Sequence, residues 1–303
     1  SDARRVLVSR GMTEAITYSF LAEKDALLFS SAPNVMKLEN PISADLSAMR
    51  SSILPNLINA ANRNAARGIL DAAIFEVGPQ FIGDRPHDQL TVGSGIRTGN
   101  AMARHWLGNH RAIDAFDAKA DVIAVLIELG IATDRLQIGT ETPSYFHPGR
   151  SGCFQQGPKN TLAYFGEMHP RILKAMNISG PVAAFEIFLD NIPKLKRKKD
   201  TARPHLCLSA YQKVSRDFAF VIDEGVTAAM VTSAANRADK KLITEIYVFD
   251  VFSGGSLGTG KKSMGLSITL QAMDRTLTDL EIEEVADKVV ANVKEATGAA
   301  LRM

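Results

Sequence analysis

The 303-residue chain is 46% hydrophobic and 22% charged, a balance that is typical of globular proteins and excludes disordered and fibrous classes. Its formal net charge of +2 is too small to indicate a nucleic-acid partner by itself. The longest apolar runs, such as residues 122–129, fall short of the roughly 20 residues that span a bilayer, and no signal peptide opens the chain, so we expect a cytoplasmic protein. Cys153 and Cys207 lack the spacing of a zinc site or a disulfide framework, and we expect no bound metal.

Residues 1–192 mix helical and strand patterns and form the first predicted domain. The chain opens on Ser1 and runs directly into an apolar and basic stretch, which predicts a start inside a longer protein. Pro55 is suited to the first turn of a helix, where its missing N–H has no intrahelical role. The helix that follows has one apolar face, made of Leu57, Ile58, Ala61 and Ala65. The β-rich residues 72–77 then predict a strand.

Residues 193–208 predict a basic linker between two domains. Residues 193–204 carry six basic residues against one acidic residue and begin and end with proline, which is typical of a solvated segment. In one interpretation this positive charge attracts a phosphate backbone, and in the other the segment is a plain spacer. The remaining residues, 209–303, predict a second compact domain.

The second domain has a βαββαβ order of predicted elements. Its strands are expected at residues 216–223, 243–252, 263–272 and 299–303, and its first helix at 227–238. The second helix begins after Thr278, which forms a capping box with Glu281, and ends at Gly298. The apolar stripe of this helix is predicted to be Leu280, Val285, Val289 and Val293. The order predicts a ferredoxin-like fold, in which both helices cover one face of an antiparallel sheet and leave the other face free.

The free face of this sheet can be predicted from alternation along the strands. If the apolar residues Met264, Leu266, Ile268 and Leu270 pack on the helices, the outward set is Ser263, Gly265, Ser267, Thr269 and Gln271. In the preceding strand, Ile246 and Val248 point inward if Tyr247 and Phe249 point outward. Two outward rings beside small polar groups suit the stacking of unpaired bases. The alternative is a domain contact that covers the rings.

A glycine-rich loop at residues 255–262 nearly matches the phosphate-binding pattern GxxxxGK[ST]. However, Lys262 stands where the pattern requires a hydroxyl that binds magnesium, and a strand-like run follows where a helix is required. We therefore reject an ATP site here. The loop is interpreted as a hairpin tip with Lys261 and Lys262, suited to an RNA backbone or to no contact at all.

Several short motifs, in shared order and spacing, resemble the beta subunit of bacterial-type phenylalanine–tRNA ligases over nearly the whole chain. In the first domain they are residues 40–43 (NPIS), 46–50 (LSAMR), 75–78 (FEVG), 147–151 (HPGRS) and 166–170 (GEMHP). In the second they are residues 215–217 (SRD), 249–252 (FDVF), 260–263 (GKKS) and 274–281 (DRTLTDLE). The second set resembles the ferredoxin-fold anticodon-binding domain of that family.

The resemblance implies an α+β protein: a class II aminoacyl-tRNA synthetase-like antiparallel sheet with flanking helices, from Arg5 to about Asn191, followed by a ferredoxin-like domain. It implies that the helix of Pro55, Leu57, Ile58, Ala61 and Ala65 pairs with a catalytic alpha subunit in an α2β2 assembly, with ordinary core packing as the alternative. It also implies tRNA binding by the second domain. We assign RNA contact to Arg216, Tyr247, Phe249, Lys261, Lys262, Ser263, Ser267, Thr269, Gln271 and Arg275.

No catalytic residue is expected in this chain. Class II active sites place cations around the developing phosphate charge, and residues 139–190 lack the Gly-x-Gly-x-x-Arg type of ending that supplies one. Glu76 stands where active domains keep a carboxylate, but a lone Glu on a strand is more often a hydrogen-bonding partner. His147 and His169 each precede proline and are interpreted as turn residues. The resemblance implies that the alpha subunit handles ATP, magnesium and phenylalanine, and that further domains, including one for proofreading, lie upstream.

Two other classes of function remain as alternatives. One is a self-sufficient nucleotide-dependent enzyme that uses Glu76 and the glycine-rich loop, and saturable ATP binding would favour it. The other is a ferredoxin-like regulatory module that binds a small metabolite and no RNA. Binding that is insensitive to salt would favour this second alternative, since contacts to a phosphate backbone weaken with salt.

Overall fold

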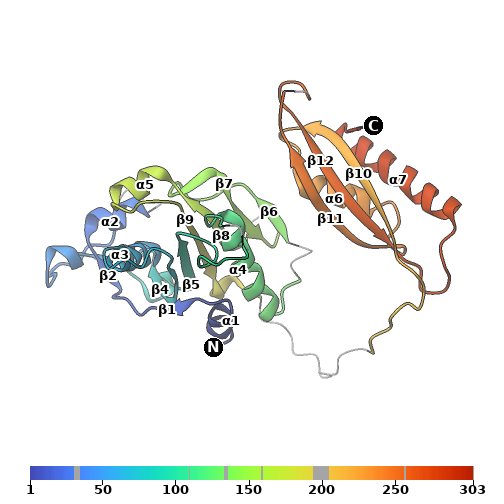
Figure 1. Ribbon diagram of the computed structural model, residues 1–303. Coiled ribbons are helices and arrows are strands. Elements are labelled where there is room, and N and C mark those ends of the chain that lie inside the picture. The colour runs from blue at the N-terminus through green and yellow to red at the C-terminus, as the bar shows by residue number, and fades with distance from the viewer. Residues whose placement is uncertain are drawn as a thin grey trace. The chain divides into compact units, whose positions relative to one another are not determined.

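The computed structural model describes residues 1–30, 35–108, 110–132, 136–157, 160–193, 205–255 and 257–302. The chain divides into two compact units, Ser1–Arg197 and Lys198–Met303, which we call unit 1 and unit 2 and describe separately (Figure 1). Most of the predicted basic linker, residues 194–204, lies outside the described residues, as does Met303.

A seven-stranded sheet forms the centre of unit 1, in the order β1-β4-β5-β9-β8-β7-β6. Neighbouring strands are antiparallel except for the parallel pair β1 and β4. The strands are β1 (Thr13–Glu14), β4 (Ala73–Phe81), β5 (Gln89–Thr98), β6 (Gln137–Gly139), β7 (Phe146–Gln155), β8 (Thr161–Met168) and β9 (Val182–Phe188). A separate small sheet pairs β2 (Phe20–Leu21) with β3 (Ala48–Met49).

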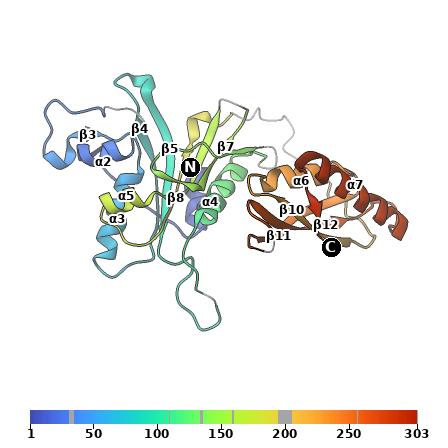
Figure 2. The same ribbon diagram turned by 90° about the horizontal axis from the view of Figure 1, so that it is seen from above.

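Helices cover both faces of the large sheet. Figure 2 shows α4 (Ala115–Glu128) and α3 (Leu54–Ala65) on opposite sides of β5 and β8. The α4 side also holds α1 (Asp2–Ser9), and the α3 side holds α5 (Pro170–Ala175). Shorter helices are α2 (Glu23–Leu28) and the 3-10 turns η1 (Ala44–Leu46), η2 (Pro86–Asp88) and η4 (Leu189–Asn191). This arrangement confirms the predicted α+β class with an antiparallel sheet and flanking helices.

The helix predicted at Pro55 is α3, with Pro55 in its first turn, and the strand predicted next is β4. Leu57, Ile58 and Ala61 are buried in the core of unit 1, while Ala65 is only half-buried. The apolar face of α3 therefore packs within its own chain, and four of the five side chains predicted for a subunit interface, those of Pro55, Leu57, Ile58 and Ala61, are buried there. Any contact of α3 with a partner must use its other side.

Unit 2 has the predicted ferredoxin-like topology. Its four-stranded antiparallel sheet has the order β11-β12-β10-β13, from strands β10 (Val214–Asp223), β11 (Ile243–Phe252), β12 (Lys261–Leu270) and β13 (Ala300–Leu301). The helices α6 (Ala228–Asn236) and α7 (Asp279–Thr297) pack on one face of it (Figure 1). In the described part of the chain, no helix is long and apolar enough to cross a membrane.

The second helix of unit 2 begins and ends as predicted. Thr278 and Glu281 form the capping box of α7, and Gly298 follows it at φ 67°. The backbone amide of Thr278 and the side chain of Arg275 lower the pKa of Glu281 to about 2. The prediction that Leu280 belongs to the buried stripe is wrong, because its side chain is 79% exposed and Ile282 is buried instead. Leu280 lies five residues before Val285, a spacing that places the two on different sides of a helix.

Candidate nucleic-acid interface and partner surface

One face of the sheet in unit 2 is not covered by any described helix (Figure 1). Leu266 and Ile268 are buried against the helices, and Ile246 and Val248 of β11 pack on the same core. Tyr247 and Phe249 therefore lie on the opposite face, with 50% and 53% of their surfaces exposed. The predicted alternation is confirmed for β12 and for residues 246–248 of β11, and a register shift between Val248 and Asp250 follows at Phe249. The Phe249 ring lies over Gly265 of β12, on the same side as Tyr247, and we call this surface the open face.

The floor of the open face is made of small residues that the rings flank. A Cβ atom at Gly265 would lie 2.8 Å from the Phe249 ring, so glycine lets this ring lie flat across β12. Tyr247 stands opposite Ser267. Ser263, Ser267 and Thr269 share the open face but are only 4–7% exposed. Their predicted orientation is right, but taller neighbours leave them as a floor with little accessible surface.

Among its described residues, the open face carries more unpaired acidic side chains than unpaired basic ones. Asp217 lies opposite Ser267 and Glu245 opposite Thr269, and both carboxylates are exposed. Lys261 lies on the same face, but its ammonium is 2.8 Å from the carboxylate of Asp223. This face therefore has little net attraction for a phosphate backbone, and its chemistry is that of two rings, hydroxyls and carboxylates.

Two further residues assigned to RNA contact, Arg216 and Lys262, do not lie on the open face. Arg216 is opposite Ile268, on the face that α7 covers. Lys262 is on the same face as Arg216, and its ammonium donates to the carbonyl of Glu224 at 2.8 Å.

Gln271 and Arg275 both follow the end of β12. The amide of Gln271 donates to the carbonyl of Tyr211 at 2.6 Å. Arg275 is paired with Asp274 and Glu281 at the start of α7. Both side chains thus hold local structure at the end of the sheet.

The glycine-rich segment turns into a strand, as predicted. β12 begins at Lys261, so both lysines lie within the strand, and the prediction that they occupy a hairpin tip is wrong. Lys261 of β12 stands opposite Asp223 of β10, the last pair of residues in this register. With a strand following it, this segment lacks the helix N-terminus that a phosphate-binding loop requires.

Glu76 of β4 forms a buried ion pair with Arg50. Arg50 and Glu76 are both buried, with Nη1 and Oε1 2.9 Å apart. Thr17 donates to the other carboxylate oxygen from its hydroxyl at 2.6 Å and from its backbone amide at 3.2 Å. Arg50 also donates to the carbonyl of Pro79 at 2.8 Å. Glu76 is thus a hydrogen-bonding partner, as predicted, and its carboxylate is not free to act on a nucleotide.

The prediction that the two histidines before proline occupy turns is wrong, because His147 lies in β7 and His169 caps the start of α5. Nδ1 of His147 accepts from the amide of Gly149, and Nδ1 of His169 accepts from the amide of Arg171 at the start of α5. Both distances are 3.1 Å, and the two rings are stacked 6.2 Å apart. Both side chains therefore hold local backbone, which accounts for their positions.

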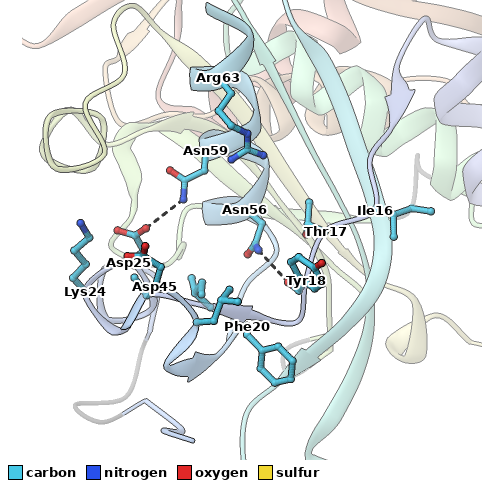
Figure 3. Close-up of a pocket in the computed structure, with 13 residues that line it drawn as sticks. Ile16, Thr17, Tyr18, Phe20, Lys24, Asp25, Asp45, Asn56, Asn59 and Arg63 are labelled. Atoms are coloured by element: carbon cyan, nitrogen blue, oxygen red, sulfur yellow. Dashed lines mark hydrogen bonds between the residues drawn. The ribbon is translucent and has the colours of Figure 1, made fainter. Parts of the chain in front are cut away.

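A cavity of about 630 Å³ lies beside the polar side of α3 (Figure 3). Asn56 donates to the carbonyl of Tyr18 at 3.0 Å, and Asn59 to the carboxylate of Asp25 at 3.3 Å. Arg63 lines the same cavity and pairs with no carboxylate of the described residues. At its edge Ile16 is 93% exposed and Tyr18 73% exposed. This surface was not predicted from the sequence, because the segment of Ile16 and Tyr18 has no periodic pattern.

Comparison with known proteins finds a family match for each unit. Residues 1–189 match the family model "Phenylalanyl tRNA synthetase beta chain CLM domain", and residues 209–302 match "Ferredoxin-fold anticodon binding domain". Phenylalanine–tRNA ligase beta subunits of Paramagnetospirillum magneticum and Bradyrhizobium diazoefficiens are 49% and 50% identical to this chain over 99% of it. The chain spans 37% and 38% of the length of these two relatives. A solved pyrrolysyl tRNA synthetase of Desulfitobacterium hafniense aligns with 63% of this chain and 62% of its own, at a TM-score of 0.47 and 14% identity.

The buried pair of Arg50 and Glu76 leads us to predict how its loss changes the stability of unit 1. Replacing Arg50 with Met leaves the Glu76 carboxylate buried without a cation, which we expect to lower the free energy of unfolding by about 3–5 kcal/mol. The double variant Arg50→Met/Glu76→Leu should recover more than half of this loss, because it removes both charges. Urea unfolding, with hydrogen exchange of β4 to identify the transition of unit 1, measures both.

The matched control for this experiment is Lys37→Met, which breaks the exposed pair of Lys37 with Glu23. Its effect should stay within about 1 kcal/mol. A double variant no more stable than Arg50→Met would contradict the structural role of the pair.

Proposed function

Because this chain belongs to the phenylalanine–tRNA ligase beta-subunit family, we propose that it is the part of that subunit that binds tRNA and supports assembly. In the complete enzyme, a cytoplasmic α2β2 complex, the reaction is ATP-dependent attachment of phenylalanine to tRNA. The alpha subunit holds ATP and magnesium, and this chain supplies no catalytic group. The ion pair of Arg50 with Glu76 supports this division of labour, since it occupies the carboxylate that stands where active domains keep one.

The observation that carries the proposal is the pair of half-exposed rings, Tyr247 and Phe249, on the open face of unit 2. Each ring can stack on an unpaired base of the anticodon region, and such stacking contributes about 1–3 kcal/mol per base. The exposed carboxylates of Asp217 and Glu245 border the rings and can accept hydrogen bonds from base amino groups. Recognition on this face is therefore by stacking and base edges, with few phosphate contacts.

The proposed domains follow the same division: residues 1–192 for assembly, 193–208 as a linker and 209–303 for tRNA. The two family models, which match residues 1–189 and 209–302, support these limits. Six basic residues lie in residues 193–204 of the linker. We propose that they attract the phosphate backbone of tRNA, which the open face does not.

The proposed contact with the alpha subunit is the cavity on the polar side of α3. Its edge carries the exposed apolar side chains of Ile16 and Tyr18, and its wall carries Arg63, which is unpaired among the described residues. Oδ1 of Asn56 is buried and has no hydrogen-bond partner in that part of the chain. Apolar surface, an unpaired cation and an unpaired acceptor at one place fit a protein partner.

Substitution of the rings tests the RNA face. Tyr247→Ala and Phe249→Ala should each weaken binding of phenylalanine tRNA by about tenfold, or ~1.4 kcal/mol, at every salt concentration, because stacking is lost and no charge changes. Lys261→Ala and Lys262→Ala should reduce the salt slope by less than one unit, because each ammonium already has a partner. Filter binding over a salt series measures affinity and slope together.

The matched control is Leu280→Ala, which removes an exposed apolar side chain from α7. It should bind as the unchanged chain does. If both ring variants bound phenylalanine tRNA as tightly as the control, the open face would not be the RNA-binding surface.

Charge reversal on α3 tests the partner surface. Arg63→Glu combined with Asn59→Arg should weaken association with the phenylalanine–tRNA ligase alpha subunit by at least about tenfold, because both side chains line the cavity. The control is Glu128→Arg at the end of α4, on the other side of the sheet. Interferometry with immobilised alpha subunit measures both. Loss of association in the control alone would place the contact on the opposite side.

A further inference from the structure

Two motifs that the proposed function leaves without a role meet at a second cavity in unit 1. Gly149, Arg150 and Ser151 of the HPGRS motif and Glu167 of the GEMHP motif line a cavity of about 400 Å³. The opposite wall comes from the first turns of α4 and from β8, and its residues include Phe116, Lys119 and Phe165. This volume is within the range of small-molecule sites.

The ammonium of Lys119 is the uncompensated charge of this cavity. Its Nζ lies 6.0 Å from the centre of the Phe116 ring and 5.9 Å from that of Phe165. Burial lowers the pKa of Lys119, which shows that its charged form is held at a cost. Among the described residues, no carboxylate lies within ion-pair distance of it.

The acids at the edge of the cavity are already paired. Asp114 lies 3.4 Å from Arg111, and Glu167 lies 2.9 Å from Nη1 of Arg150. This second pair uses a single guanidinium nitrogen of Arg150 and leaves its other donors for a ligand. The cavity therefore holds one unpaired cation, one partly used guanidinium and no free acid.

The walls around these cations are aromatic. The ring of Phe116 is 72% exposed although it lies beside the core, and Phe165 forms the base of the same wall. A lysine that served only to cover apolar surface would direct its ammonium into water. Here the ammonium stays between two rings at the mouth of a cavity.

We propose that this cavity binds an organic anion in which a carboxylate or phosphate group is joined to a flat apolar body. The anionic group pairs with Lys119 and reaches the free donors of Arg150, and the flat body packs on Phe116. The site is distinct from the open face of unit 2 and from the cavity beside α3, and it requires neither.

Four small probes separate the two parts of this proposal. Phenylacetate and phenyl phosphate carry both an anion and a ring, acetate carries only the anion, and benzyl alcohol carries only the ring. We expect saturable amide shifts at residues 115–119 and 149–151 of the whole chain with the first two, and at least tenfold weaker binding of the other two. Tighter binding of phenyl phosphate would indicate a phosphate ligand, and tighter binding of phenylacetate a carboxylate. Benzyl alcohol binding as well as the anions, or no saturable shift, would overturn the proposal.

Lysine variants test the role of the charge. Lys119→Met keeps the length of the side chain and should weaken phenylacetate and phenyl phosphate at least tenfold, whereas Lys119→Arg should restore most of the affinity. Affinity should also fall as pH rises through the lowered pKa of Lys119, because the neutral amine cannot pair with an anion. The control is Lys174→Met on the exposed side of α5. Unchanged affinity in Lys119→Met, with its amide spectrum intact, would overturn the assignment.

Discussion

The buried pair of Arg50 and Glu76 ties the segments around Thr17 and Arg50 to the large sheet of unit 1. Arg50 precedes α3, Glu76 is in the middle of β4, and Thr17 bonds the same carboxylate, so three separate segments converge on two charges. Because a buried charge without its partner is costly, these segments are held together or lost together. The segment of Ile16 and Tyr18, which borders the cavity beside α3, is fixed by this pair. The same carboxylate that could have served catalysis thus builds the surface that we propose for assembly.

The open face of unit 2 follows from a different constraint, which is the alternation of side chains in a sheet with helices on one side only. The helices take the apolar residues of β12, and the small residues left on the other face let two rings of β11 lie exposed beside them. Bulkier residues in place of Gly265 and Ser267 would displace the rings from the sheet. The exposed carboxylates of Asp217 and Glu245 leave this face with little net attraction for phosphate, and we therefore propose that electrostatic attraction for tRNA comes from elsewhere in the chain.

Local patterns predicted most of the fold, and long-range packing explains where they failed. The capping box at Thr278, the left-handed Gly298 and the alternation at Tyr247 depend on near neighbours and were predictable. Leu280 was misplaced because apolar character was counted without its helical angle. The apolar face of α3 was visible in the sequence, but what covers it was not, since its partners Tyr145 and Ile172 lie about a hundred residues away. The ion pair of Lys261 with Asp223 and the two cavities of unit 1 arise from tertiary contacts that no spacing reveals.

The central claim is that unit 2 reads the anticodon region of tRNA through its open face. The most direct test is binding of this chain to phenylalanine tRNA and to the same tRNA with a changed anticodon, at two salt concentrations. The account predicts tighter binding of the native anticodon by a factor that stays constant between the two salts, because stacking and base-edge contacts are insensitive to salt while phosphate contacts are not. Equal affinity for the two tRNAs at both salts would contradict it, and would confine the chain to a role in assembly.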